Sequence, residues 1–247
     1  MWRRAIGTIL ISLIVASVSI FAGFWQLERM EQRRTFNATV SERLQQPVVY
    51  AAQIAPVGAP LPESLTWRQV SFTGSYDLAN QILIRGRYLD GRYGYGVVTP
   101  LIGESGAALL VDRGWVAAGE SATAVPEVPP PPVGRVSITG RLKAKDTSLG
   151  PQGAIIGLPT RAANTINPAA IAAELPYPVY GGYVELVTQE PAQSSPRPRP
   201  APQLSQGPHL AYAVQWFFFA ALALIAPVIF LRARPPEVEQ SHPDGVG

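Results

Sequence analysis

The chain is 247 residues long, with a hydrophobic fraction of 47% and a formal net charge of +3 at pH 7. It has no cysteine and only two histidines, which excludes disulfides, thiolate metal sites, iron–sulfur clusters and a zinc or copper site built from histidines. The basic residues are scattered arginines, with lysine only at 143 and 145, so no basic run or basic helix points to nucleic acid.

The first apolar segment, residues 5–27, is long enough to cross a bilayer, which takes about 20 residues in a helix. Arg3 and Arg4 before it resemble the start of a cleaved signal peptide. However, the apolar run exceeds the core of about 7–15 residues that a signal peptide has. It also ends at Phe24 and Trp25, and aromatic residues favour a membrane interface. We expect an uncleaved anchor.

The interior of the chain has short runs of alternating apolar and polar residues, separated by Gly and Pro. This alternation predicts β-strands, and Asp90-Gly91 predicts a tight hairpin turn. We expect Pro100 to end the strand after this turn, and a short Ala-rich helix to follow Asn167. The strands are predicted at residues 67–74, 81–88, 93–101, 107–116, 135–142 and 182–187.

Together these segments predict a membrane protein in which two transmembrane helices, forming a hairpin, flank a mainly antiparallel β domain that resembles a barrel or a sandwich. Pro-rich stretches at 125–133 and 191–208 predict stiff spacers. The predicted parts are a cytoplasmic N-terminus (1–4), the first transmembrane helix (5–27), a helical extension (28–46), an extracytoplasmic β domain (47–190), a Pro-rich stalk (191–208), the second transmembrane helix (209–231) and a disordered cytoplasmic tail (232–247).

The orientation follows from the arginines in the short flanks of the two apolar segments. Arg3 and Arg4 precede the first segment, and Arg232 and Arg234 follow the second. Basic flanks favour the cytoplasmic side, so both termini are predicted inside and the central domain outside. Arg29 and two further arginines just past the first segment oppose this orientation.

His209 is the candidate site residue, at the predicted outer end of the second helix. At helical spacing His209, Tyr212 and Trp216 share a face, with small alanines beside them. An imidazole among aromatic and small residues could take a flat apolar ring system, and histidine is a common axial ligand of haem iron.

The antiparallel helix hairpin should place Trp25 and Gln26 beside His209, because they end the first helix at the same membrane depth. The alternative interpretation is that Trp25, Tyr212 and Trp216 form an ordinary aromatic belt at the membrane interface. In that case His209 lies at the headgroup level and binds nothing.

Arg113 and Trp115 lie in an apolar predicted strand, Val111-Asp112-Arg113-Gly114-Trp115-Val116. A charge inside such a strand is costly unless it is paired, and neighbouring side chains in a strand point to opposite faces, so Asp112 does not simply neutralise Arg113. The hypotheses are an anion or partner contact through Arg113 and Trp115, or a structural ion pair.

No enzyme motif can be assembled from this sequence. The stretch Tyr93-Gly94-Tyr95-Gly96 lacks the lysine and the helix start of a phosphate-binding loop. There is no Gly-x-Ser-x-Gly elbow, and neither histidine is placed for a Ser/His/Asp triad. We expect no enzymatic activity, and a membrane-tethered hydrolase is only a distant alternative.

The chain resembles the Surfeit-locus cytochrome c oxidase assembly family. The similar stretches follow one another in the family's order across nearly the whole chain, between the two apolar segments. They are Gly23-Phe24-Trp25-Gln26-Leu27-Glu28-Arg29, Gly74-Ser75-Tyr76-Asp77, Gly94-Tyr95-Gly96-Val97-Val98-Thr99-Pro100-Leu101, the Val111 to Val116 stretch, and His209-Leu210-Ala211-Tyr212-Ala213-Val214-Gln215-Trp216-Phe217.

The resemblance implies a bacterial plasma-membrane assembly factor for haem–copper cytochrome c oxidase. It also implies that haem A binds transiently, with the iron at His209, and is inserted into the catalytic subunit. Trp25, Gln26, Tyr212 and Trp216 would line that site, with Met30 or Tyr212 as a possible second ligand. Implied partners are the lipid bilayer and the oxidase catalytic subunit or haem A synthase. The alternative is a scaffold that stabilises an oxidase intermediate without binding haem.

Overall fold

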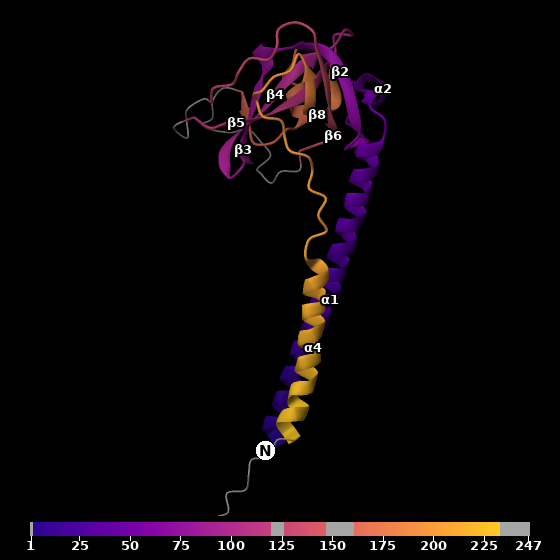
Figure 1. Cartoon of the computed structure of the whole chain (residues 1–247), viewed down its shortest axis with the longest axis vertical. Helices are drawn as coiled ribbons and strands as arrows, with labels where there is room; N and C mark the ends of the chain where they lie inside the picture. The colour runs from indigo at the N-terminus through magenta and orange to yellow at the C-terminus, as the bar shows by residue number, and fades with distance from the viewer. Residues whose placement is uncertain (1, 120–125, 147–160, 233–247) are drawn as a thin grey trace, which may run out of the picture. The chain divides into compact units, whose positions relative to one another are not determined.

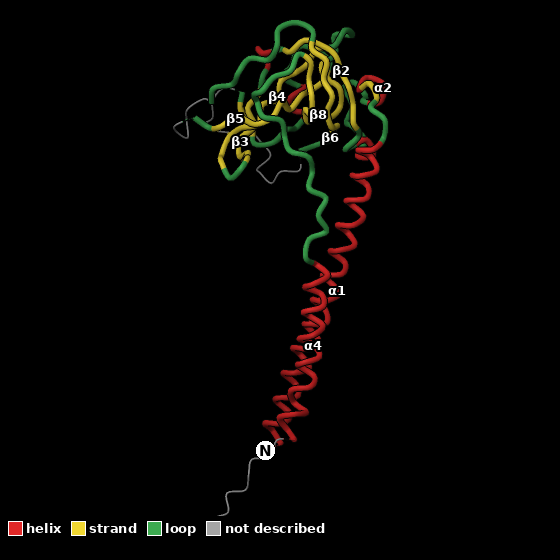
Figure 2. Tube along the Cα trace, in the orientation of Figure 1, coloured by secondary structure: helices red, strands yellow, loops and turns green. Residues whose placement is uncertain are grey.

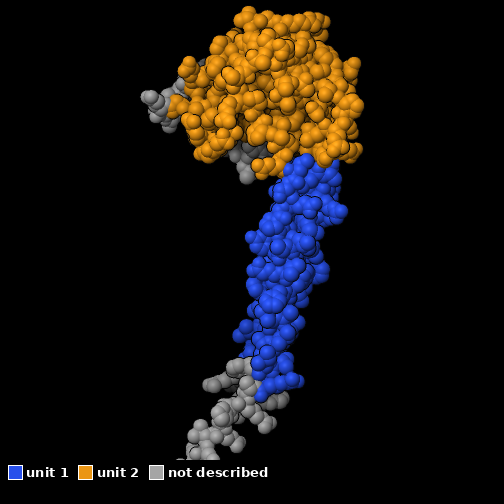
Figure 3. Space-filling model, viewed as in Figure 1, with its two compact units in different colours: residues 1–38, 204–247 blue, residues 39–203 orange. Residues whose placement is uncertain are grey.

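The computed structural model describes residues 2–119, 126–146 and 161–232. The chain divides into two compact units, shown in different colours in Figure 3. Residues 1–38 and 204–247 form the helical unit, and residues 39–203 form the sheet unit. Two apolar helices thus flank a mostly sheet domain, which confirms the predicted fold class. Nearly all of the predicted tail lies outside the described residues.

The helical unit consists of most of α1 (Trp2–Gln45), up to residue 38, and of α4 (His209–Arg232), and the two helices run side by side (Figures 1 and 2). Both are long and apolar enough to cross a membrane, with mean hydropathies of 2.3 and 2.0 in their most apolar windows. Only 17% of each window is buried, so most of the apolar side chains point away from the partner helix. Such exposure suits lipid contact and would be costly in water.

Small residues form the contact between the two helices. Ala16, Ser19 and Gly23 of α1 are buried at three- and four-residue spacing, and Ala213 and Ala220 of α4 are buried two turns apart. Small side chains allow close backbone approach, which drives helix association in membranes. Gly23 is the tightest position, because a Cβ there would lie 2.6 Å from Phe217 Cε1.

The sheet unit contains all six predicted strands, with ends shifted by a few residues. It also contains the short helices α2 (Ala51–Ile54) and α3 (Pro168–Ala172), the latter in the predicted place after Asn167, whose side chain caps it by accepting from Ala170 N at 3.2 Å. The strands are β1 (Val49–Tyr50), β2 (Gln69–Tyr76), β3 (Ile82–Leu89), β4 (Arg92–Ile102), β5 (Ala108–Ala117), β6 (Val136–Lys143), β7 (Ala162–Ala163) and β8 (Val179–Glu190).

Five of these strands pair in a closed ring, in the order β2-β6-β8-β5-β4 and back to β2. Four of the ring pairings are antiparallel, as predicted, and β5 with β8 is parallel. Each ring strand contributes side chains to one apolar core, which includes Phe72, Leu101, Val111, Ile138 and Val184. The ring is therefore held by shared burial as well as by backbone hydrogen bonds.

The turn between β3 and β4 is the predicted hairpin turn. Asp90 and Gly91 both have positive φ, 51° and 75°, as a two-residue type I′ turn requires. The prediction that Pro100 ends the strand is wrong: β4 continues to Ile102. Proline has no backbone N–H to donate to a neighbouring strand. The carbonyl of Pro100 accepts from Asp77 N at 2.9 Å, just beyond the β2–β4 pairing, so no donor from Pro100 is needed on that side.

The predicted Pro-rich stalk differs from the structure over its first part. Residues 191–203 belong to the sheet unit. Arg197 exchanges two backbone hydrogen bonds with Trp115, of 2.8 and 2.9 Å. Gly114 has φ of +125°, and a Cβ there would overlap the Arg197 carbonyl. We call residues 196–200 the strap, because they lie on the sheet rather than forming a free spacer.

Candidate functional site

His209 and Gln26 form the polar contact of the helical unit. His209 begins α4 directly after Pro208, and its Nδ1 lies 2.8 Å from Gln26 Oε1. Gln26 is half-buried and lies three residues after Gly23, on the same face of α1. The two residues are therefore close together, as predicted, and their proximity follows from the antiparallel packing of the two helices.

The hydrogen bond determines which nitrogen of His209 has the lone pair. A carboxamide oxygen only accepts, so Nδ1 donates to Gln26 Oε1. In a neutral imidazole the lone pair then lies on Nε2. Metal-binding histidines commonly have this arrangement, in which a neighbouring acceptor fixes the tautomer and the ring orientation.

A hollow of about 300 Å³ adjoins His209. Its other lining residues, Arg29, Gln32, Arg33 and Phe36, all come from α1. The Arg29 guanidinium donates to Gln32 Oε1 at 3.2 Å and stands 5.8 Å from the centre of the Trp25 ring. Two guanidinium groups beside an imidazole make this hollow suited to an anionic group next to a metal or apolar ring.

The arginines of this hollow were not among the predicted site residues, because we considered them only for membrane orientation. Their spacing contained the necessary signal. Gln26, Arg29, Arg33 and Phe36 follow one another at three- and four-residue steps, which places them on one face of a helix.

The aromatic side chains predicted for the site are exposed or only half-buried. Trp25 and Tyr212 each leave 48% of their surface exposed. Trp216 is half-buried and packs edge-to-face on Phe219, with 5.8 Å between ring centres. Exposed aromatic side chains at the end of an apolar helix also suit a membrane interface.

Arg113 lies in the sheet unit and is fully buried. In the pairing of β4 with β5, Val97 opposes Gly114 and Val98 opposes Asp112, so Arg113 is the extra residue of a β-bulge. Its guanidinium donates to Gln81 Oε1 at 3.1 Å, to the Pro129 carbonyl at 3.1 Å and to Gln193 Oε1 at 2.8 Å. Burial lowers the pKa of Arg113 to about 10.

Trp115 is also buried, and its indole Nε1 donates to the Arg87 carbonyl at 3.1 Å. This hydrogen bond and the backbone hydrogen bonds to Arg197 hold Trp115 inside the sheet unit. Arg113 and Trp115 therefore do not share one exposed surface.

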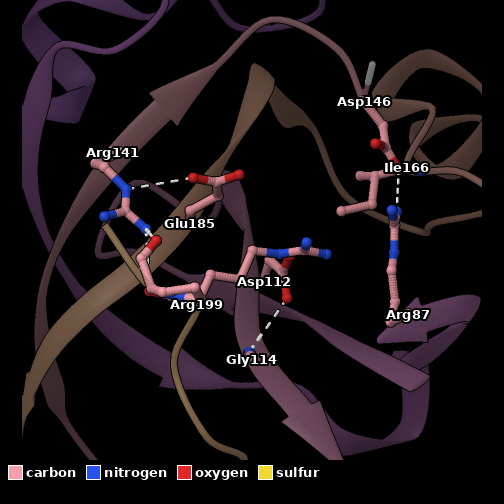
Figure 4. Close-up of polar contacts among 9 residues, drawn as sticks. Arg87, Asp112, Gly114, Arg141, Asp146, Ile166, Glu185 and Arg199 are labelled. Carbon is pink, nitrogen blue, oxygen red and sulfur yellow. Dashed lines mark hydrogen bonds and ion pairs between the residues drawn. The ribbon is translucent and has the colours of Figure 1, made fainter. Parts of the chain in front are cut away.

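A second polar cluster, shown in Figure 4, joins the strap to the sheet. Buried Asp112 accepts from Arg199 Nε at 2.5 Å and from Gly114 N at 3.2 Å. Arg141 pairs with Glu185 at 3.3 Å and donates to the carbonyls of Arg199 and Pro200, both at 3.2 Å. The predicted structural ion pair thus exists at Asp112, and its partner is Arg199.

Arg87 and Asp146 form a further ion pair beside this cluster, and Asp146 also accepts from Ile166 N at 3.0 Å. These groups serve the packing of the sheet unit. Over the described ranges of the chain, no three His, Asp or Glu side chains gather in a group that could hold a metal ion.

The sequence was compared with known proteins. The sequence model of the SURF1 family matches residues 13–221. An uncharacterized SURF1-like protein of Mycobacterium tuberculosis is 30% identical over 223 residues, covering 89% of this chain and 81% of that protein. A SURF1-like protein of Rickettsia felis is 33% identical over 44% of this chain and 46% of its own length. The cytochrome oxidase assembly protein SHY1 of Saccharomyces cerevisiae is 26% identical over 40% of this chain and 25% of its own length.

Proposed function

The chain belongs to the SURF1 family, and we propose that it is a membrane-anchored assembly factor for haem–copper cytochrome c oxidase that binds haem A and assists its insertion into the catalytic subunit. The name of the yeast relative supports the assembly role. The two apolar helices support a membrane location, and we propose that this membrane is the plasma membrane of a bacterium.

The observation that supports haem binding best is the His209–Gln26 contact beside the arginine-rimmed hollow. Haem A combines an iron, an apolar ring with a long apolar tail, and two carboxylates. Nε2 of His209 would supply a ligand to the iron, since Nδ1 is engaged by Gln26. Arg29 and Arg33 would pair with the carboxylates, and the exposed apolar faces of α1 and α4 would accompany the tail in lipid.

A carrier must release its cargo, so its affinity has to be moderate. A single protein ligand at His209 suits transient binding. A second protein ligand is unassigned, and Met30 and Tyr212 are its candidates. In this proposal the sheet unit faces away from the cytoplasm and docks on the oxidase catalytic subunit or on haem A synthase, and the chain acts as a carrier without catalysing a reaction.

An absorption spectrum tests the proposal. The intact protein is co-expressed with a haem A synthase, purified in mild detergent, and compared with His209→Ala and His242→Ala. We expect a haem A spectrum in the wild type and in His242→Ala, and its loss in His209→Ala. A folded but colourless wild type, together with normal oxidase assembly in His209→Ala cells, would contradict the carrier and leave the scaffold that never binds haem.

A further inference from the structure

We infer that Arg113 and the hollow beside it form a binding site for a carboxylate, supplied by a small organic acid or by an acidic side chain of a protein partner. This site lies in the sheet unit, and its existence does not depend on haem binding at His209. Arg113 has an uncompensated charge, an Nε–H group without an acceptor among the described residues, and a hollow beside it.

The charge of Arg113 has no opposite charge among its contacts in the described part of the chain. Its three hydrogen-bond acceptors are two side-chain amides and a backbone carbonyl, and the ring of Tyr76 lies 5.5 Å from its guanidinium carbon. Burial of a cation without a counterion is costly, and neutral acceptors recover only part of the lost solvation.

Two buried or half-buried acidic residues of β5 and β8 are already engaged by other arginines. Asp112, the preceding residue, pairs with Arg199, and Glu185 on β8 pairs with Arg141. By contrast, Arg113 Nε is buried and has no hydrogen-bond partner among the residues that the structure describes. A carboxylate binds a guanidinium best through two parallel hydrogen bonds, and it would supply both the charge and the acceptor that Arg113 lacks.

A hollow of about 230 Å³ adjoins Arg113. Its polar lining comes from β8 and from the loop after it, through Thr188, Gln189 and Gln193. Gln193 Oε1 already accepts from Arg113 at 2.8 Å, so an entering carboxylate can replace this neutral acceptor with a charged one. The amide groups of the lining can hydrogen-bond the rest of a small acid.

A bulge is a suitable place for such a side chain. Bulges re-aim a residue away from the regular alternation of a strand, and they are frequent beside binding sites. Here the bulge on β5 directs a long cation toward three neutral acceptors from Gln81, Pro129 and Gln193, which lie far apart in the sequence.

The test uses the full chain in detergent and sodium propionate as the probe, with sodium chloride at equal ionic strength as the reference. Thermal unfolding is followed by tryptophan fluorescence in the wild type, in Arg113→Met and in Arg135→Met. Arg135 is a matched control, because its side chain is 65% exposed and its removal changes the net charge equally. We expect a saturable rise in the unfolding midpoint with propionate in the wild type and Arg135→Met, and none in Arg113→Met.

A second measurement does not depend on a variant. In the wild type labelled with ¹⁵N-arginine, propionate should shift one buried Nε–Hε resonance, and chloride should not. The source of the carboxylate is then distinguished with two capped tripeptides, Gly-Glu-Gly and Gly-Gln-Gly. Binding of the Glu peptide alone would assign the site to an acidic side chain, whereas binding of propionate alone would assign it to a small acid. No resonance shift and no difference between propionate and chloride in the wild type would overturn the inference.

Discussion

The contact between His209 and Gln26 lets one neutral side chain set the tautomer of another. Gln26 contributes no charge, yet as an acceptor it places the proton of the imidazole on Nδ1 and leaves the lone pair on Nε2. The half-buried amide also orients the ring, as the proposed haem site requires.

Replacing Gln26 with Leu should therefore weaken haem A binding without abolishing it. Loss of such a supporting acceptor typically costs about 10–100-fold in metal affinity. Titration of the purified protein with haem A measures the change. Gln215→Leu, an exposed amide on α4, is the matched control and should bind like the wild type. Equal affinities in the two variants would show that Gln26 does not support the ligand.

Arg113 predicts a pH dependence with a definite sign. The folded pKa is lowered from its ordinary value to about 10, so above pH 10 the folded protein releases this proton before the unfolded chain does. The group therefore reduces stability while it is charged, and the penalty is full below about pH 10 and fades as the pH rises above it.

Without added carboxylate, Arg113→Met should be at least as stable as the wild type at neutral pH, because an apolar side chain replaces an uncompensated buried charge. The stability advantage should shrink as the pH rises through about 10. Chemical unfolding of both proteins at several pH values measures it. A variant that is strongly destabilised at neutral pH would show that the three hydrogen bonds outweigh the cost of the charge.

At the level of the elements, the close packing of α1 against α4 requires glycine at particular positions. Gly23→Val would press a branched side chain into the Phe217 ring. Overpacking of this kind costs about 1–3 kcal/mol. We expect a lower melting temperature of the helical circular dichroism signal in detergent. Gly7→Val is the control on the same helix, since a Cβ there meets nothing within 4 Å. Equal melting of the two variants would contradict the observed helix contact.

The strap gives a second prediction at this level. Gly114→Ala should cost roughly 3 kcal/mol, because it adds an overlap with the Arg197 carbonyl to the strain of a positive φ. Gly106→Ala has the same sign of φ in open space and should cost only about 1 kcal/mol. Urea unfolding followed by tryptophan fluorescence compares them. Similar midpoints would mean that the strap is not held at Gly114.

The strands, the hairpin turn and the two apolar helices could be predicted because each has a local signal of alternation, turn residues or length. The long-range pairings had no such signal. The parallel pairing of β5 with β8 joins Leu110 to Tyr183, and the Asp112–Arg199 ion pair joins a strand to a Pro-rich segment that composition alone suggested was a free spacer. Of the site, the proximity of Gln26 to His209 followed from helix antiparallelism, whereas Arg29 and Arg33 could have been found from helical spacing.

For the whole molecule, the proposed orientation can be tested by cysteine labelling, because the chain contains no cysteine of its own. Val133 is 99% exposed in the sheet unit, and His242 belongs to the predicted cytoplasmic tail. In intact cells a membrane-impermeant maleimide should label Val133→Cys and not His242→Cys, with both labelled after permeabilisation. The reverse pattern would place the sheet unit inside the cell.

The closed ring of strands also limits how this protein can recognise another. Many proteins bind a partner by adding its chain as an extra strand along an open sheet edge. In the described part of the sheet, the ring strands have neighbours on both sides, and β1 adds only two residues to β2. The remaining edge belongs to β3, which β7 covers only at Leu83 and Ile84. Recognition through an added strand should therefore be confined to the outer edge of β3, and elsewhere a partner interface should depend on side chains and loops.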